Sequence, residues 1–304
     1  MKEFDLAIAH TWEYDKDFVD LIEKILQENG LSTFTVQFHN YEEVHFRIQT
    51  NELRFNHYLD RASDADDCFL PLAKLLTKKK TYIINNYSQV EIATDKATMH
   101  LEFISRGINT PFTIIISPFS KKNEIVLSVS ELAKLGRPFI IKPANTTGGG
   151  LGVVTGAESL NDILRERQYL RDDKYLLQGR VLPLEMDNKR FWFRCFWAFG
   201  KVFPCWWDDV THQYTVVTEN EIERYDLKQL SRVIKKIQKI CGLDFFSTEI
   251  ALNEYGKFIV VDYVNEICDM RFQSKHFDGV PDEVVDGIVK ALLKFIKSSR
   301  QAMV

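Results

Sequence analysis

The 304-residue sequence lacks an excess of either charge, because 39 Lys and Arg residues stand against 43 Asp and Glu residues, a net charge of −4. A weakly acidic chain is poorly suited to coating nucleic acid. No apolar run reaches the roughly 18 residues that span a bilayer, and the first residues carry too many charges for a secretion signal. We therefore expect neither nucleic acid nor a membrane as partner.

Cysteine is also scarce, with five residues, an odd number, and no CxxC pair. This usage predicts reduced thiols in a cytoplasmic protein. Cys195, Cys205 and Cys268 fall in apolar or strand-like stretches and are expected to be small buried residues. The sequence has no internal repeat and no low-complexity linker. At roughly 100–200 residues per domain, the length predicts two or three packed units.

The first ninety residues alternate between apolar runs of strand length and an amphipathic helix that ends at Gly30. Strands alternating with helices predict a parallel sheet with crossover helices. We expect an α/β domain over residues 1–90. The expected elements are strands at 4–10, 31–38 and 81–85, a helix at 17–30, and helical structure over 42–62.

The remainder predicts α+β structure, because helical stretches alternate with hairpins. A helix over 88–106 precedes a strand, and residues 174–217 are mostly strand-like. The other expected elements are a strand, Gly-rich loop and strand within 130–154, helices at 226–241 and 281–297, and strands at 246–252 and 257–264. We divide this part into a central domain over 91–180 and a C-terminal domain over 181–304.

The most informative segment is FIIKPANTTGGGLGVV, residues 139–154. Its glycines permit close approach to a ligand, and exposed N–H groups can cradle an anion. Lys142 would place a cation at the base of this loop. The order of residues differs from that of a P-loop, and a strand rather than a helix follows the glycines.

A second signal lies near the C-terminus, where Glu249 and Asp262 fall on two strands that flank a tight turn, with Asn265 three positions later. Neighbouring antiparallel strands can aim such side chains into one site. Two carboxylates and an amide oxygen suit Mg²⁺ that also binds substrate phosphates. An ion pair or a turn cap is the alternative for Asp262.

Two weaker signals complete the series. Lys96 lies within an expected helix, where a lysine is usually a solvated charge. The strand YLLQGRVLP, residues 175–183, ends in a connector whose backbone could hold adenine, with Asp187 or Glu185 beyond it for ribose hydroxyls.

The linear order of these features resembles the ATP-grasp superfamily, in particular glutathione synthetase, D-alanine–D-alanine ligase and ribosomal-protein glutamate ligases. The resemblance covers roughly residues 80–297. It implies an ATP-grasp fold that follows an N-terminal parallel-sheet domain. It also implies ATP and Mg²⁺ as cofactors.

The resemblance assigns a role to each element of the series. Lys96 and Lys142 match the lysines that bind the ATP phosphates. Asp187 matches the acid that binds the ribose, with Glu185 as the less favoured alternative. Arg194, with Arg190 as alternative, matches the arginine that steadies the transferring phosphate. The loop that closes over the phosphates matches Thr147, Gly148, Gly149 and Gly150. The adenine-binding connector matches Gln178, Gly179 and Val181. The magnesium ligands match Glu249, Asp262 and Asn265.

The sequence departs from the family pattern at the metal strand. Asp262 and Asn265 are one residue further apart than usual, so either a bulge absorbs the extra residue or Glu266 or Asp269 serves instead. Arg271 could clamp a substrate carboxylate or phosphate, with an ion pair to Asp269 or Asp278 as the alternative. The Arg-x-Asn substrate loop of the glutamate-adding relatives is not found, and the corresponding region reads PCWWDDVTHQY, residues 204–214.

The resemblance implies an ATP-dependent carboxylate–amine ligase that forms an acyl phosphate and releases ADP and phosphate. A small-molecule carboxylate and amine are the expected substrates, while a peptide or protein acceptor and a homodimer remain open. The alternative is a kinase that phosphorylates a polyol hydroxyl, for which Asp208 and Asp209 offer acids near the acceptor. A nucleotide-binding module without catalysis and a nucleic-acid binder are the remaining alternatives. Trp206 and Trp207 are candidates for a substrate wall.

Overall fold

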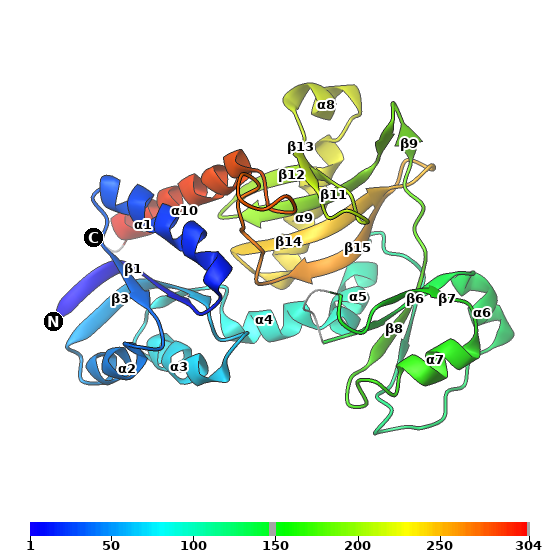
Figure 1. Cartoon of the computed structure of the whole chain (residues 1–304), viewed down its shortest axis with the longest axis horizontal. Coiled ribbons are helices and arrows are strands. Elements are labelled where there is room, and N and C mark those ends of the chain that lie inside the picture. The colour runs from blue at the N-terminus through cyan, green and yellow to red at the C-terminus, as the bar shows by residue number, and fades with distance from the viewer. Residues whose placement is uncertain (146–149, 303–304) are drawn as a thin grey trace.

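A four-stranded parallel sheet forms the N-terminal part of the chain in the computed structural model, which describes residues 1–145 and 150–302 (Figure 1). Alternate residues of the central strand β1 (Lys2–His10) face opposite sides of the sheet. Leu6 and Ile8 pack towards α1 (Lys16–Glu28) and α10 (Asp282–Ala302), whereas Ala7 and Ala9 pack towards α2 (Tyr41–Gln49) and α3 (Leu70–Lys78). The predicted α/β start is confirmed. The strands, in spatial order, are β2 (Thr33–Val36), β1 (Lys2–His10), β3 (Leu53–Arg61) and β4 (Tyr82–Ile84). The helical segments are η1 (Glu13–Asp15), α1 (Lys16–Glu28), α2 (Tyr41–Gln49), η2 (Asp67–Phe69) and α3 (Leu70–Lys78).

The helical prediction for 42–62 is wrong in its second half, where β3 pairs with β1. This strand carries buried polar side chains that obscure its pattern. His57 contacts the backbone oxygen of Asp5 through Nδ1 and the hydroxyl of Ser299 through Nε2. Arg61 donates two hydrogen bonds to Asp15. Because each polar group is satisfied by a distant residue, the strand can be buried without a continuous apolar run.

The predicted helix over 88–106 is two helices, α4 (Tyr87–Thr94) and α5 (Lys96–Ser105). Asp95 interrupts it, because its carboxylate accepts hydrogen bonds from the N–H groups of Ala97 and Thr98 and so caps α5. Asp95 also pairs with Lys174, which ties the start of α5 to the small sheet that follows. The break fixes the position of Lys96 at the first turn of α5.

A second sheet is small and antiparallel, and its apolar side is covered by α6 (Val129–Leu135) and α7 (Leu160–Glu166) (Figure 1). Lys142 lies on one of its central strands. The strands, in spatial order, are β5 (Thr113–Ile116), β8 (Tyr175–Gly179), β6 (Phe139–Pro143) and β7 (Val154–Ala157).

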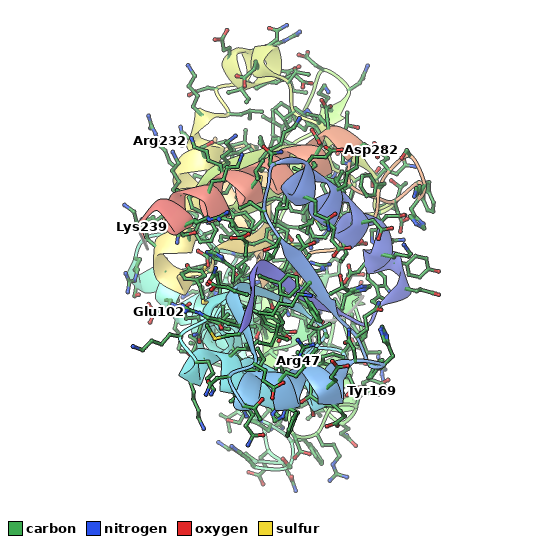
Figure 2. All side chains as sticks on the ribbon, turned by 90° about the vertical axis from the view of Figure 1, so that its left-hand side faces the viewer. Arg47, Glu102, Tyr169, Arg232, Lys239 and Asp282 are labelled. Carbon is green, nitrogen blue, oxygen red and sulfur yellow. The ribbon has the colours of Figure 1, made fainter. Side chains whose placement is uncertain are left out.

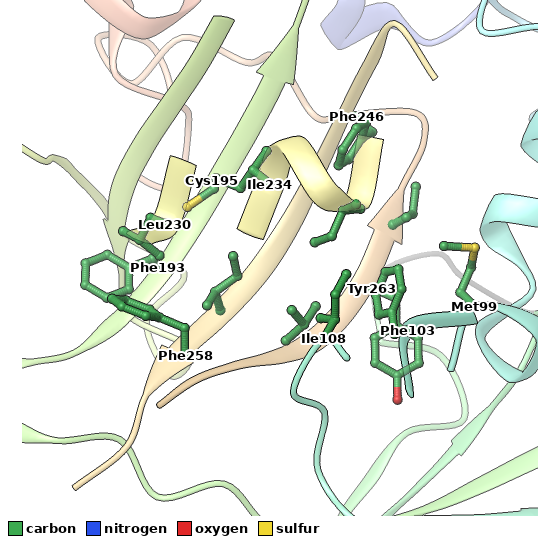
Figure 3. Packing of buried hydrophobic residues seen from close by; sticks show 14 of the residues in the cluster. Met99, Phe103, Ile108, Phe193, Cys195, Leu230, Ile234, Phe246, Phe258 and Tyr263 are labelled. Carbon is green, nitrogen blue, oxygen red and sulfur yellow. The ribbon is translucent and has the colours of Figure 1, made fainter. Parts of the chain in front are cut away.

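The third sheet has five antiparallel strands and carries most of the predicted site. One of its faces packs on α9 (Lys228–Cys241) through residues such as Phe193, Phe246 and Ile234 (Figure 3). The strands, in spatial order, are β13 (Tyr214–Val216), β12 (Lys201–Trp207), β11 (Trp192–Ala198), β14 (Phe245–Leu252) and β15 (Phe258–Asn265). The remaining elements are β9 (Glu185–Met186), β10 (Lys189–Arg190), α8 (Glu219–Arg224) and α10 (Asp282–Ala302).

All five cysteines are free thiols, and Cys195, Cys205 and Cys268 are buried as predicted. α10 returns to the N-terminal part of the chain and packs beside α1, so the last helix joins the first sheet to the third (Figure 1). In the described part of the chain, no helix combines the length and apolar character needed to cross a bilayer.

Candidate active site

A row of charged side chains crosses three strands of the five-stranded sheet. Arg194 on β11 lies opposite Glu249 on β14, and Glu249 lies opposite Asp262 on β15. Residues that face each other across antiparallel strands project from the same side of the sheet. The row therefore lies on the face opposite the α9 core.

A bulge in β15 brings Asn265 to the same face. Ser247 pairs with Asn265 and Glu249 pairs with Asp262, so two steps along β14 match three steps along β15. The extra residue is absorbed between Asp262 and Asn265. The bulge expected from the longer spacing is thus present. Glu266, the alternative ligand, instead accepts a hydrogen bond from Asn85 Nδ2 at 3.2 Å.

Glu249 is held by two donors from β11. Arg194 Nη1 donates to its Oε1 at 2.5 Å, and Trp192 Nε1 donates to its Oε2 at 3.2 Å. The Arg194 guanidinium also donates to Ser247 Oγ. Burial alone would lower the pKa of Arg194, but Tyr214, Glu249 and Asp262 outweigh burial and raise it. Arg194 therefore stays charged and fixes the orientation of Glu249.

Lys142 reaches this row from the small sheet. Its Nζ donates to the backbone oxygen of Val261 at 3.0 Å, lies 3.8 Å from Asp262 Oδ1, and sits 5.2 Å from the centre of the Tyr263 ring. Burial lowers the pKa of Lys142, against the opposing effect of Asp262. Two segments 120 residues apart in the sequence (262 − 142) thus meet at one point.

Asp262 is surrounded by positive charge. Burial acts to raise its pKa, but Lys142, Lys96 and Arg194 outweigh burial and hold the pKa below its usual value. Lys96 is itself buried at the start of α5. The ionised carboxylate is therefore strongly favoured, as a cation ligand requires.

A buried polar network adjoins the row on β8 and β15. The Tyr263 hydroxyl lies 2.6 Å from His100 Nδ1 and accepts a hydrogen bond from Gln178 Nε2 at 3.1 Å. Burial and the charge of Lys142 lower the pKa of His100 to about 4, so its ring is neutral. Among the described residues, Gln178 Oε1 is a buried acceptor with no hydrogen-bond partner. This oxygen is free to accept a donor from a ligand.

The other predicted nucleotide contacts lie near that network. Gly179 donates its N–H to the backbone oxygen of Phe112, and Val181 packs in a small apolar cluster with Trp192, Ala251 and Val261. Gly150 has a φ of 76°, a conformation that suits glycine. Thr147, Gly148 and Gly149 lie outside the described residues.

Three further predicted side chains are engaged in ion pairs with residues outside the charged row. Asp187 accepts hydrogen bonds from Arg224 and Tyr225 at the β9–β10 turn. Arg271 directs all three guanidinium nitrogens to Asp269 and Asp278, which is the ion-pair alternative for this residue. Arg190, the alternative to Arg194, pairs with Asp209.

Trp206 and Trp207 lie on opposite faces of β12. Trp206 packs against Phe193 in the α9 core, so it is a core residue and not a substrate wall. Trp207 lies on the charged face, with its ring 5.7 Å from the Arg194 guanidinium and stacked on His212.

Sequence reasoning missed Trp192, Ser247, His100 and Tyr263. Only Trp192 and Ser247 could have been found, because each lies two residues from Arg194 or Glu249 on the same strand and so faces the same side of the sheet.

The donor set fits a hard divalent cation. Among residues 1–145 and 150–302, no three His, Cys, Asp or Glu side chains form a metal-binding group. Two carboxylates and an amide oxygen are nevertheless the partial set that Mg²⁺ uses when phosphates and water complete its shell. The cations around Asp262 suit the triphosphate that such an ion would accompany.

Comparisons with known proteins show the fold. No family model matches the sequence, and no curated protein matches it. D-alanine–D-alanine ligase from Bacillus anthracis complexed with ATP is similar in structure, at 13% identity and a TM-score of 0.66 over 99% of both chains. The ATP-grasp ligase PsnB complexed with a precursor peptide and AMPPNP matches at 12% identity and a TM-score of 0.63, over 96% of this chain and 98% of PsnB. An ATP-grasp RimK domain protein from Sphaerobacter thermophilus matches at 17% identity and a TM-score of 0.61, over 95% of this chain and 98% of the RimK domain protein.

Proposed function

Because the chain has the ATP-grasp fold, we propose that it is an ATP-dependent ligase. Its reaction would transfer the γ-phosphate of ATP to a substrate carboxylate and then join the acyl group to an amine, releasing ADP and phosphate. The observation that carries the proposal is the approach of Lys142 Nζ to within 3.8 Å of Asp262, in line with Glu249 and Arg194. Cations and carboxylates at one point suit a metal–triphosphate complex.

The nucleotide would lie between the small sheet and the five-stranded sheet. Lys96 and Lys142 would bind its phosphates, and the loop of Thr147 to Gly150 would cover them and exclude water. The unpaired oxygen of Gln178 supports adenine, whose exocyclic amine is a donor. Gly179 and Val181 would complete the base site, and Asp187 would leave Arg224 to reach the ribose.

Glu249, Asp262 and Asn265 would hold Mg²⁺, which neutralises phosphate charge when bound. Arg194 orients Glu249 in the free protein. Its charge would also stabilise the transferring phosphate. These residues act by position and charge, so no covalent contribution from the chain is required.

The acceptor is proposed to be a small molecule or a peptide. The similar structures are named for D-alanine in one case and contain a precursor peptide in another. Trp207, with His212 stacked on its ring, lies beside Arg194 and would form one wall of the acceptor site. The kinase alternative is less well supported, because Asp209 pairs with Arg190 and Asp208 accepts from the N–H groups of Val210 and Thr211. Both carboxylates thus already have partners in the free protein.

Product analysis tests the proposal. The protein would be incubated with Mg·ATP, hydroxylamine and pools of amino acids or peptides. Hydroxylamine converts an acyl phosphate to a hydroxamate and free phosphate, so a ligase gives ADP and free phosphate in equal amounts, matched by the sum of hydroxamate and amide. A kinase gives ADP and a phosphorylated product without free phosphate, and that result would replace the ligase proposal.

A further inference from the structure

Helix α9 carries a local concentration of positive charge. Its fourteen residues include five cations and no acid, in a chain whose net charge is −4. Figure 2 shows Arg232 and Lys239 at the outer edge of the molecule along this helix. Within the described residues, none of the five cations is in an ion pair: Lys228, Arg232, Lys235, Lys236 and Lys239.

One stripe of this helix borders a cavity of about 230 Å³ and consists of Gln229, Arg232, Val233 and Lys236. The other walls are residues 107–109, which follow α5, and the turn between β14 and β15. The stripe repeats at intervals of three and four residues, which marks one helix face. This cavity lies on the α9 side of the five-stranded sheet, whereas the row of Arg194, Glu249 and Asp262 lies on the other face.

The cavity has two kinds of lining. Val233 supplies apolar surface, together with the small exposed parts of Ile108 and Phe258, which are each 5% exposed. The cations Arg232 and Lys236 come from α9, and a third, Lys257, comes from the turn. Lys236 Nζ donates to the backbone oxygen of Gly107 at 3.2 Å, which holds it across the cavity wall. Like charges gathered around one concave site repel each other, and a ligand carboxylate would relieve that repulsion.

We propose that this groove binds an acidic segment of a peptide or protein partner. An apolar side chain of the segment would sit among Ile108, Val233 and Phe258, and flanking carboxylates would pair with Arg232, Lys236 and Lys257. A free phosphate would leave the apolar lining uncovered. The net negative charge of the chain disfavours nucleic acid more than a short acidic segment, because a long polyanion extends beyond the groove over the remaining surface. The inference does not depend on the ligase proposal.

The test is a fluorescence anisotropy titration of the full chain with a labelled ten-residue peptide of Glu, Asp and Leu. The double variant Arg232→Glu/Lys236→Glu should weaken binding by about tenfold or more, because both rim cations become repulsive. The matched control is Lys235→Glu/Lys239→Glu, which makes the same charge change on the same helix away from the cavity. It should weaken binding by less than about threefold, the share due to long-range charge.

A third variant, Val233→Asn, tests the apolar lining and should weaken the Leu-containing peptide while leaving a peptide with Ser in place of Leu unchanged. Circular dichroism would establish that each variant is folded. Equal weakening by the two double variants, no binding to the wild type, or tighter binding of oligodeoxythymidylate than of the peptide would each overturn the proposal.

Discussion

Replacing Asp262 with Asn removes a negative charge that attracts Lys142, Lys96 and Arg194, while it preserves the volume of the side chain. Lys142 Nζ lies 3.8 Å from the carboxylate. Opposite charges about 4 Å apart attract by roughly 4 kcal/mol at an effective dielectric constant of 20. This is the gross electrostatic energy that the substitution removes.

The net effect on stability should be smaller. Burying the carboxylate has its own desolvation cost of several kcal/mol, which Asn largely avoids, but Lys142 then loses one partner of a buried pair. Because Glu249 still acts on Lys142, we expect the free energy of unfolding to fall by about 3 kcal/mol, the low end for breaking a buried pair. Activity depends on the charge itself, because a neutral amide binds a divalent cation and its phosphates weakly. ADP release should fall by about a hundredfold or more.

The measurement combines a coupled assay of ADP release with urea unfolding. Asp286→Asn is the matched control, because Asp286 forms an exposed pair with Lys290 one turn along α10. It should change neither quantity. A folded Asp262→Asn protein that releases ADP at nearly the normal rate would show that Asp262 is not part of the nucleotide site.

Three further predictions follow from the same contacts. Among the described residues, Arg194→Ala leaves Trp192 as the one side-chain donor to Glu249. The free energy of unfolding should therefore fall by roughly 2–4 kcal/mol. A loss below about 1 kcal/mol in urea unfolding would contradict the pairing of Arg194 with Glu249. Gln178→Leu removes the unpaired acceptor and should raise the KM for ATP by about tenfold with little change in kcat, so an unchanged KM would exclude this oxygen as a base contact. Burial raises the pKa of Glu266 from about 4.5 to about 8, so between these pH values the native state holds a proton that the unfolded state has released. Stability should fall as pH rises through that window, and Glu266→Gln should flatten the dependence; an unaltered slope in the variant would refute it.

The sequence predicted the N-terminal sheet and the long helices because their apolar patterns are regular. It failed for β3, where His57 and Arg61 are buried and find partners on other elements. It also failed at Asp95, because a side-chain cap breaks one apparent helix into two. Both errors arise where a polar group is satisfied by residues that are distant in the sequence or by the local backbone.

The site was predictable where residue spacing fixes geometry. Glu249 and Asp262 flank a tight turn, so their pairing follows from the hairpin, and the bulge follows from the extra residue before Asn265. The meeting of Lys142 with Asp262 joins two sheets and followed from the resemblance, not from local pattern. Arg271 could not be assigned in advance, because its two partners become neighbours only in the folded loop.

The most direct test of the account is a crystal structure of the protein with Mn²⁺ and AMPPNP, in which anomalous scattering locates the metal. The account predicts a metal peak at the carboxylates of Glu249 and Asp262, with the nucleotide phosphates within hydrogen-bonding reach of Lys142. Metal and nucleotide bound in a different crevice, away from these three side chains, would contradict it.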